Sequence, residues 1–113
     1  MKKRGEIWWV NFDPAIGQEV QKSRPSVIVS NNKSNKALKR YQVVPLTTSI
    51  KKVYPGETII SVNGNDVRAL GNQIMTVSEL RFTNKIGKVT DVEMKRIEQT
   101  LIVQLGLGDK DAD

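Results

Sequence analysis

The nine residues from Gly17 to Pro25 bring together side chains that could do chemistry. They read Gly-Gln-Glu-Val-Gln-Lys-Ser-Arg-Pro, so the Glu19 carboxylate and the Arg24 guanidinium stand five residues apart. Pro25 has a fixed φ and biases Arg24 toward an extended backbone, which predicts that Arg24 lies at the start of a strand. The alternative is a plain surface ion pair, which contributes about 0–1 kcal/mol.

A run of three hydroxyls, Thr47, Thr48 and Ser49, is the second candidate. It follows Tyr41–Leu46, an apolar segment that is typical of a strand. Hydroxyls at the end of a strand can donate hydrogen bonds to a phosphate, or they can cap a turn. Spacing alone leaves both interpretations open.

The composition excludes most other catalytic chemistry. The 113 residues contain no Cys and no His, which excludes disulfides, thiolate catalysis, Ser-His-Asp triads and nearly every zinc site. The twelve carboxylates are scattered singly, and no glycine-rich phosphate loop is present. We therefore expect no bound metal and no cofactor, and an enzyme with this composition must use Glu, Asp, Arg, Lys, Ser, Thr or Tyr.

Charge and hydropathy indicate the kind of partner and the compartment. Eighteen Lys and Arg against twelve Asp and Glu give a net charge of +6, which is typical of a protein with a polyanion or an acidic protein as partner. Charge alone leaves open the alternative of a merely soluble surface. The apolar stretch Ile7–Val10 after the basic N-terminus is too short for a signal peptide, and no run is long enough for a membrane helix. We expect a cytoplasmic protein without membrane contact.

Short strands with tight turns must position these groups. Alternating or β-branched runs predict strands at Glu6–Phe12, Pro25–Ser30, Tyr41–Leu46, Glu57–Val62, Asp66–Leu70, Asn72–Val77 and Ile86–Val89, with a short helix or turn over Asn31–Arg40. Asn63-Gly64 between two of these runs is a strong hairpin signal. Trp8 and Trp9 should point to opposite faces of their strand, so at least one belongs to the core or to a dimer interface.

One longer helix closes the chain. Thr90 and Glu93 match a capping box, and an apolar stripe follows at helical spacing and ends at Gly106, consisting of Met94, Ile97, Leu101 and Leu105. We interpret this stripe as core packing. The pattern as a whole predicts a mainly β (α+β) protein, a small antiparallel barrel with a C-terminal helix, as one domain over residues 1–108 with a polar tail at 109–113.

Four separated motifs in this order resemble the MazF/PemK family of toxins. They are GEIWWVNFDP with GQE and SRPSVIVS (residues 5–30), VPLTT (44–48), NQIMTV (72–77) and the segment Gly87–Leu107. The resemblance implies an SH3-like barrel and a homodimer. It also implies a type II toxin–antitoxin endoribonuclease that cuts single-stranded RNA sequence-specifically, without a metal, leaving 2′,3′-cyclic phosphate and 5′-hydroxyl ends.

The resemblance assigns roles to individual residues. The catalytic Arg of the family falls on Arg24, its catalytic Thr on Thr47, and an acidic loop residue with a proton-transfer role on Glu19. We expect substrate contacts from five further polar residues, namely Gln18, Lys22, Thr48, Ser49 and Gln73. An acidic, partly disordered antitoxin is expected to block the same groove. Met75 and Asn72 stand where many relatives carry Arg and an acidic residue, which affects the expected RNA sequence preference.

Basic residues in loops around or near this groove should bind RNA electrostatically. They are Lys22, Lys33, Lys36, Lys39, Arg40, Lys51 and Lys52. Two other functions stay open at this point: a toxin of the same fold that poisons a DNA topoisomerase, and a barrel that binds RNA without cutting it. The first would not need Arg24 or Thr47.

Overall fold

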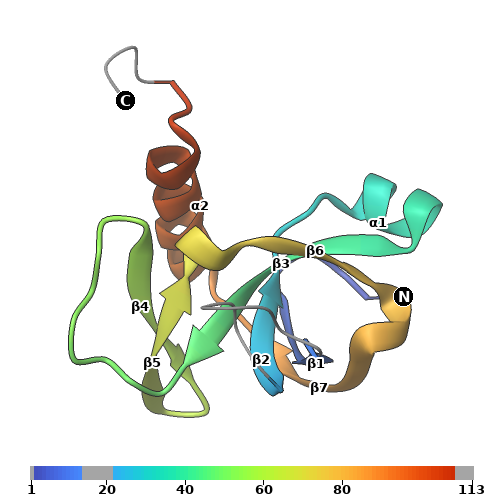
Figure 1. Ribbon diagram of the computed structural model, residues 1–113, viewed down its shortest axis with the longest axis horizontal. Coiled ribbons are helices and arrows are strands. Elements are labelled where there is room, and N and C mark those ends of the chain that lie inside the picture. Colours follow the sequence, from blue (N-terminus) through green and yellow to red (C-terminus); the bar gives the residue numbers. More distant parts are fainter. Residues whose placement is uncertain (1, 14–21, 109–113) are drawn as a thin grey trace.

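Seven strands form one curled sheet in the computed structural model, which describes residues 2–13 and 22–108 (Figure 1). The elements in chain order are β1 (Glu6–Asn11), β2 (Ser23–Ile28), α1 (Asn32–Leu38), β3 (Arg40–Thr47), β4 (Glu57–Val62), β5 (Asn65–Leu70), the 3-10 turn η1 (Gly71–Gln73), β6 (Met75–Ser78), the 3-10 turn η2 (Glu79–Arg81), β7 (Phe82–Lys88) and α2 (Asp91–Leu105). The predicted mainly β fold with a C-terminal helix is confirmed.

The long strand β3 organises the sheet. The strand order is β4-β5-β3-β2-β1-β7, and every pairing between described strands is antiparallel. The first half of β3 pairs with β6, from Arg40 to Val43, whereas its last two residues, Leu46 and Thr47, pair with β5. The sheet therefore divides at β3, and Thr47 lies where β5 and the loop to β4 meet.

Both faces of the sheet are covered, because successive side chains of a strand point to opposite faces. One cluster packs under α2 and consists of Ile7, Val27, Val44, Leu46, Ile60, Val67, Ala69, Val89, Met94 and Ile97. The other lies on the opposite face and consists of Val10, Phe12, Ile28, Tyr41, Val43, Val77 and Phe82. Neighbours such as Val43 and Val44 belong to different clusters, so a slip of one residue in register would disrupt both.

The local signals formed the predicted turns and caps. Asn63 and Gly64 both have positive φ (52° and 82°), as a two-residue hairpin between β4 and β5 requires. The Thr90–Glu93 capping box begins α2, and Gly106 ends it in the left-handed conformation. No helix in the described part of the chain is long and apolar enough to cross a bilayer.

Three expectations need correction. The last strand begins at Phe82 instead of Ile86, and residues 71–73 form a 3-10 turn before β6 where an extended segment was predicted. Leu105 is 53% exposed, so the apolar stripe of α2 is core only as far as Leu101. The physical reason is that the final turns of α2 extend past the sheet they would have to cover (Figure 1).

Candidate active site at the ends of β2 and β3

The pairing of β2 with β3 brings Arg24 and Thr47 together. Ser26 is paired with Pro45 and Val27 with Val44. Continued two residues further, this antiparallel register places Arg24 level with Thr47. Since residues two apart share a face, both side chains lie on the face of Ser26 and Pro45. Both residues are half-buried.

Arg24 is the second residue of β2, at the start of the strand as predicted. Its partner across β1 is Val10, a fully buried residue of the second core cluster. Pro25 follows it and is paired with Trp9. Among the described residues, the Arg24 guanidinium forms no ion pair. The backbone of Arg24 is thus held by β1 on one side, while its charge is not neutralised by a described carboxylate.

The Thr47 hydroxyl caps the turn that follows β3. Its Oγ1 accepts a hydrogen bond from the Ser49 N–H at 3.3 Å. The turn-capping interpretation of this residue therefore holds, but an accepting oxygen keeps its own hydrogen, which can still be donated to a ligand. Thr48 and Ser49 are exposed directly beside it.

The other predicted site residues occupy several places. Gln18 and Glu19 lie outside the described residues. Lys22 is exposed where the chain enters β2, and its N–H donates to the Asp13 carboxylate at 2.7 Å. Gln73 is half-buried in η1. This turn connects β5 to β6, and both of these strands pair with β3.

Four of the expected RNA-binding cations lie away from this site. Lys33, Lys36 and Lys39 belong to α1 and its C-terminal cap, and Arg40 begins β3, whereas Thr47 ends it. The length of β3 separates them from Thr47, because α1 lies at one end of this strand and the 48–56 loop at the other (Figure 1). Lys51 and Lys52 are in that loop and are exposed.

The two tryptophans have different environments. Trp8 packs against the second core cluster, with its ring edge-on to Phe82 at 6.0 Å and the Lys2 ammonium 5.0 Å from its centroid. Trp9 points to the other face and is 37% exposed. Trp8 therefore has a structural role, as alternation predicted for at least one of the pair.

Hydrogen bonds and an ion pair surround the Glu6 carboxylate beside Trp8. Burial raises the pKa of the Glu6 carboxyl, but hydrogen bonds from the Lys3 N–H, Lys85 and Trp8 outweigh it and hold this pKa below its ordinary value. Burial and the nearby Glu79 carboxylate raise the pKa of Tyr41. Both groups are held by structural partners and lie outside the Arg24–Thr47 pair.

Arg68 is a neighbour of Thr47 that sequence reasoning missed. It is paired directly with Thr47 across β5 and β3, and with Ile59 across β4. The alternation of buried Val67 and Ala69 around it shows which face it occupies, but no sequence signal gave the pairing of β5 with β3.

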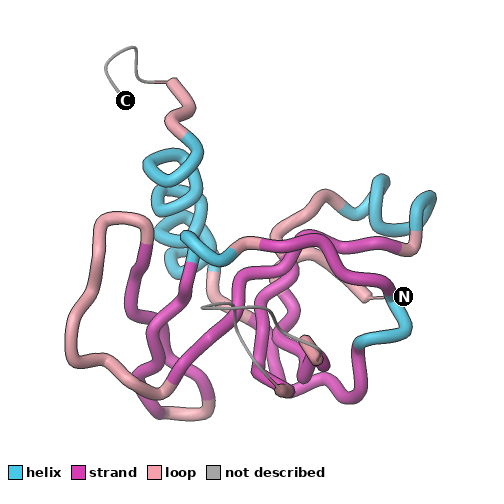
Figure 2. Tube along the Cα trace, in the orientation of Figure 1, coloured by secondary structure: helices cyan, strands magenta, loops and turns pink. Residues whose placement is uncertain are grey.

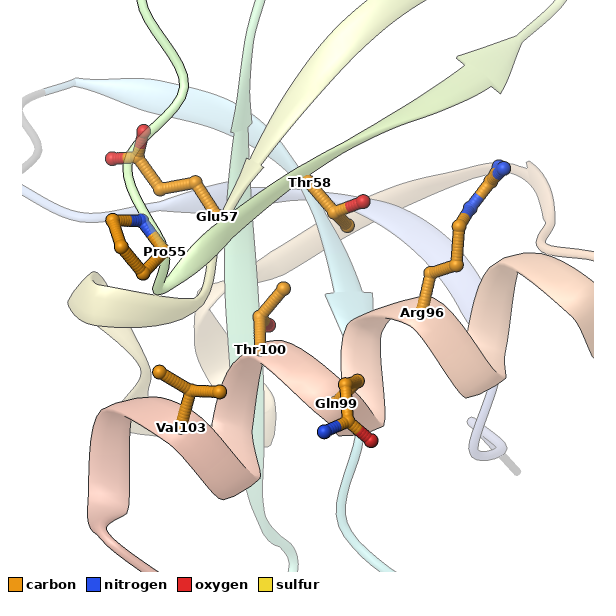
Figure 3. Close-up of a pocket in the computed structure, with 7 residues that line it drawn as sticks. All are labelled: Pro55, Glu57, Thr58, Arg96, Gln99, Thr100 and Val103. Atoms are coloured by element: carbon orange, nitrogen blue, oxygen red, sulfur yellow. The ribbon is translucent and has the colours of Figure 1, made fainter. Parts of the chain in front are cut away.

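The pocket in Figure 3 is separate from this site. It has a volume of about 220 Å³ and lies between the start of β4 and α2, lined by Pro55, Glu57, Thr58, Arg96, Gln99, Thr100 and Val103. Neither Arg24 nor Thr47 reaches it. Within residues 2–13 and 22–108, no three acidic side chains come together as a metal site would require.

A family model covers nearly the whole of this fold. The model of the "PemK-like, MazF-like toxin of type II toxin-antitoxin system" matches residues 3–105. The chain belongs to this family. The match spans both strands that carry the Arg24–Thr47 pair.

Curated relatives of the PemK/MazF family align along most of the chain. Endoribonuclease MazF9 of Mycobacterium tuberculosis is 36% identical over 95% of this chain and 98% of its own length. The endoribonuclease toxin MazF of Escherichia coli is 35% identical over 90% of this chain and 92% of its own.

Solved structures share the PemK/MazF fold. MazF from Deinococcus radiodurans superposes with a TM-score of 0.83 at 22% identity, covering 93% of this chain and 96% of its own. A mycobacterial endoribonuclease in complex with its cognate antitoxin gives a TM-score of 0.79 at 23% identity, covering 95% of this chain and 97% of its own.

Proposed function

We propose that this member of the PemK/MazF family is a sequence-specific endoribonuclease that cuts single-stranded RNA without a metal. The observation that carries the proposal is the antiparallel register of β2 and β3, which, continued by two residues, supports a placement of Arg24 level with Thr47 on one face of the two strands. An arginine and a hydroxyl donor in that arrangement can bind the same phosphate. The names of the curated relatives support the same activity.

RNA supplies its own nucleophile in this reaction, so the absence of Cys and His from the chain is no obstacle. The ribose 2′-oxygen attacks the adjacent phosphorus in line, and the bond from phosphorus to the 5′-oxygen breaks. The products are a 2′,3′-cyclic phosphate and a 5′-hydroxyl. One proton leaves the 2′-hydroxyl and one reaches the departing 5′-oxygen.

Arg24 stabilises the charge that builds on the phosphorane oxygens. Its planar fork can donate to two of them at once, which a lysine ammonium does less well. Thr47 adds a neutral hydrogen bond to the same phosphate. A guanidinium group is a poor proton donor in proteins, so we assign Arg24 to charge stabilisation in preference to proton transfer.

Glu19 is the proposed base for the 2′-hydroxyl. It lies outside the described residues, and its assignment rests on the family resemblance and on its position five residues before Arg24. A carboxylate in a partly buried site has a raised pKa, which improves it as a base. Thr47, Arg24 or water can serve as the donor to the 5′-oxygen.

The RNA strand is proposed to cross the exposed ends of β2 and β3. Lys22, Thr48 and Ser49 lie there, and Lys51 and Lys52 follow in the loop. Gln18 and Gln73 complete the proposed substrate contacts. Positive groups along such a path attract the phosphate backbone, whereas base-edge contacts supply sequence preference.

We propose that the toxin works as a cytoplasmic homodimer and is silenced by an acidic, partly disordered antitoxin. Structures of this fold include a complex with a cognate antitoxin, which supports the second part. Charge complementarity with the +6 chain would speed association. A complex that cut RNA as fast as the free protein would contradict steric blocking.

One assay tests the function. Purified protein is incubated with mixed-sequence single-stranded RNA in excess EDTA, and the products are separated and their ends analysed. Discrete fragments with cyclic-phosphate ends are expected. Intact but shifted RNA would instead indicate a binding barrel. Intact, unshifted RNA would favour a toxin that acts on another target, such as a topoisomerase.

A further inference from the structure

The carboxylate of Glu57, the first residue of β4, connects three segments. Glu57 is 8% exposed. Its Oε1 accepts the Tyr54 N–H at 3.1 Å, and its Oε2 accepts the Asn72 side-chain N–H at 2.9 Å. The Arg68 Nε lies 3.7 Å from Oε1. One buried group thus contacts the loop before β4, the strand β5 and the turn η1.

Arg68 holds the same loop at a second point. Its Nη1 donates to the backbone carbonyl of Lys52. Its Nε is buried and makes no hydrogen bond within the described structure, so Glu57 is its nearest compensating charge. Buried charges of this kind are retained in a fixed geometry, because either one left alone would be costly.

The loop that these residues hold has little else to order it. It runs from Thr48 to Gly56 without helix or strand, as Figure 2 shows. Its residues up to Pro55 are exposed. A segment with few buried apolar contacts opens easily unless polar contacts fix it. The contacts at Lys52 and Tyr54 therefore restrain this loop together with two hydrogen bonds at its ends, from the Ser49 N–H to Thr47 Oγ1 and from the Glu57 N–H to the Tyr54 carbonyl.

The turn η1 is held by the Glu57 carboxylate and by the end of the same loop. Besides the hydrogen bond from Asn72, Gly71 packs so closely that a Cβ there would lie 2.6 Å from the Gly56 carbonyl oxygen. The end of the loop and the start of η1 are thus in backbone contact. Gln73, one of the proposed substrate contacts, is the last residue of this turn.

We propose that Glu57 and Arg68 are positioning residues of the nuclease, which hold the 48–56 loop and η1 so that Thr48, Ser49 and Gln73 contact RNA together. Arg68 is paired with Thr47 through the sheet and with Glu57 through its side chain, so it connects the two halves of the site. This inference rests on the proposed function. It adds a residue pair that touches the loop backbone instead of the substrate.

The test compares Arg68→Ala and Glu57→Gln with a matched pair elsewhere. Arg4, which precedes β1, and Glu98 of α2 form an Arg–Glu ion pair at 2.6 Å, so Arg4→Ala and Glu98→Gln change the net charge equally. Two quantities are measured: amide hydrogen exchange over residues 50–57, and affinity for a mixed single-stranded RNA whose 2′-hydroxyls are methylated to prevent cutting. Circular dichroism checks that each variant is folded.

Arg68→Ala and Glu57→Gln should both speed amide exchange at Tyr54. Both should also weaken RNA binding by roughly tenfold, which is the effect of losing one hydrogen bond to a charged group. The control variants should change neither the exchange rate nor the affinity. Unchanged amide exchange in either variant would contradict the proposal that Glu57 and Arg68 hold the loop. Faster amide exchange with wild-type RNA affinity would contradict the proposal that the held loop is needed for RNA binding.

Arg68→Lys separates position from charge. It keeps the positive charge but cannot reach Lys52 and Glu57 with one fork. We expect exchange to stay fast and affinity to stay low. Restored affinity with fast exchange would show that Arg68 acts only as a charge, which contradicts the proposal. If the wild-type protein bound no RNA, the proposed function would be rejected. The exchange data would still decide whether Glu57 and Arg68 hold the loop.

Discussion

Arg24 has almost no freedom in its backbone, because β1 pairs on one side of it and a proline follows. The register of β2 with β3, continued by two residues, brings its side chain level with Thr47 on one side of β3, while Arg68 is paired with Thr47 on the other side. The spacing before Pro25 predicted this placement, although the strand begins one residue earlier than the arginine.

Replacing Arg24 by lysine should keep the fold and lose most of the cleavage. Lysine retains the charge but not the fork that meets two phosphorane oxygens, and loss of one preorganised donor typically costs about 10²–10³ in rate. Single-turnover cleavage of the RNA measures the effect. Arg96→Lys on α2 is the matched control, and a near-normal rate for Arg24→Lys would reject the two-oxygen role.

Thr47→Ala should slow cleavage less than the Arg24 substitution, by roughly tenfold, as expected for one neutral hydrogen bond. Thr47→Ser keeps the hydroxyl that caps the turn at Ser49 and should restore most of the rate. The same single-turnover assay compares the two. If alanine cost nothing, Thr47 would be a turn cap and no more.

Arg68 shows where prediction of the site stopped. The sequence places it correctly in a hairpin strand between two apolar residues, but its importance comes from being opposite Thr47. That pairing depends on how far β3 continues past β6, which no local pattern encodes. The same holds for Glu57, whose partners lie 3, 11 and 15 residues away.

At the scale of elements, strong local signals predicted the structure well. The Asn63-Gly64 hairpin and the α2 capping box formed at the expected residues because turn and cap geometry depend on a few adjacent side chains. The start of β7 was missed because Thr83, Asn84 and Lys85 are exposed and β1 pairs with this strand through bulges. Such a strand has no clean alternation to detect.

The α2 capping box also fastens the helix to the sheet. Glu93 accepts the Thr90 N–H at 2.9 Å and the Ser61 N–H of β4 at 2.7 Å. Burial raises the pKa of the Glu93 carboxyl, but these hydrogen bonds outweigh it and hold its pKa below its ordinary value of 4.5. Its ionised form therefore stabilises the folded state above this pH, and the contribution is lost as the pH falls through the lower, folded-state pKa.

Glu93→Gln should lower the free energy of unfolding at pH 7 by about 1–3 kcal/mol, and the difference from wild type should shrink at pH 3. Urea titrations at the two pH values measure it. Glu98→Gln on the same helix, which removes a partly exposed carboxylate, should have little effect. An equal loss at both pH values would assign the effect to the cap geometry instead of the charge.

At the scale of the whole molecule, two groups of lysines lie toward opposite ends of β3. Lys33, Lys36 and Lys39 surround α1, whereas Lys22, Lys51 and Lys52 lie near the ends of β2 and β3. Composition predicted a basic protein but could not say that β3 separates these groups. The second group lies at the end of β3 that carries Thr47, where we propose that the RNA strand crosses.

The salt dependence of RNA binding should distinguish the two ends. A plot of log affinity against log salt becomes shallower by about 0.7 for each lost phosphate contact with a single strand. Lys51→Gln should reduce the slope by up to that amount, and Lys36→Gln, which removes the same charge from α1, should leave it unchanged. A larger effect of Lys36→Gln would move the RNA path to the other end of β3.

The contrasting surroundings of Trp8 and Trp9 give the protein an internal pair of fluorophores. Trp8 is packed beside Phe82 under the Lys2 ammonium, while Trp9 is 37% exposed on the opposite face. Emission should therefore contain one component that acrylamide quenches readily and one that it quenches poorly, and Trp9→Phe should remove the first. Unfolding of the second core cluster can then be followed by fluorescence, with no label attached, through the component that belongs to Trp8.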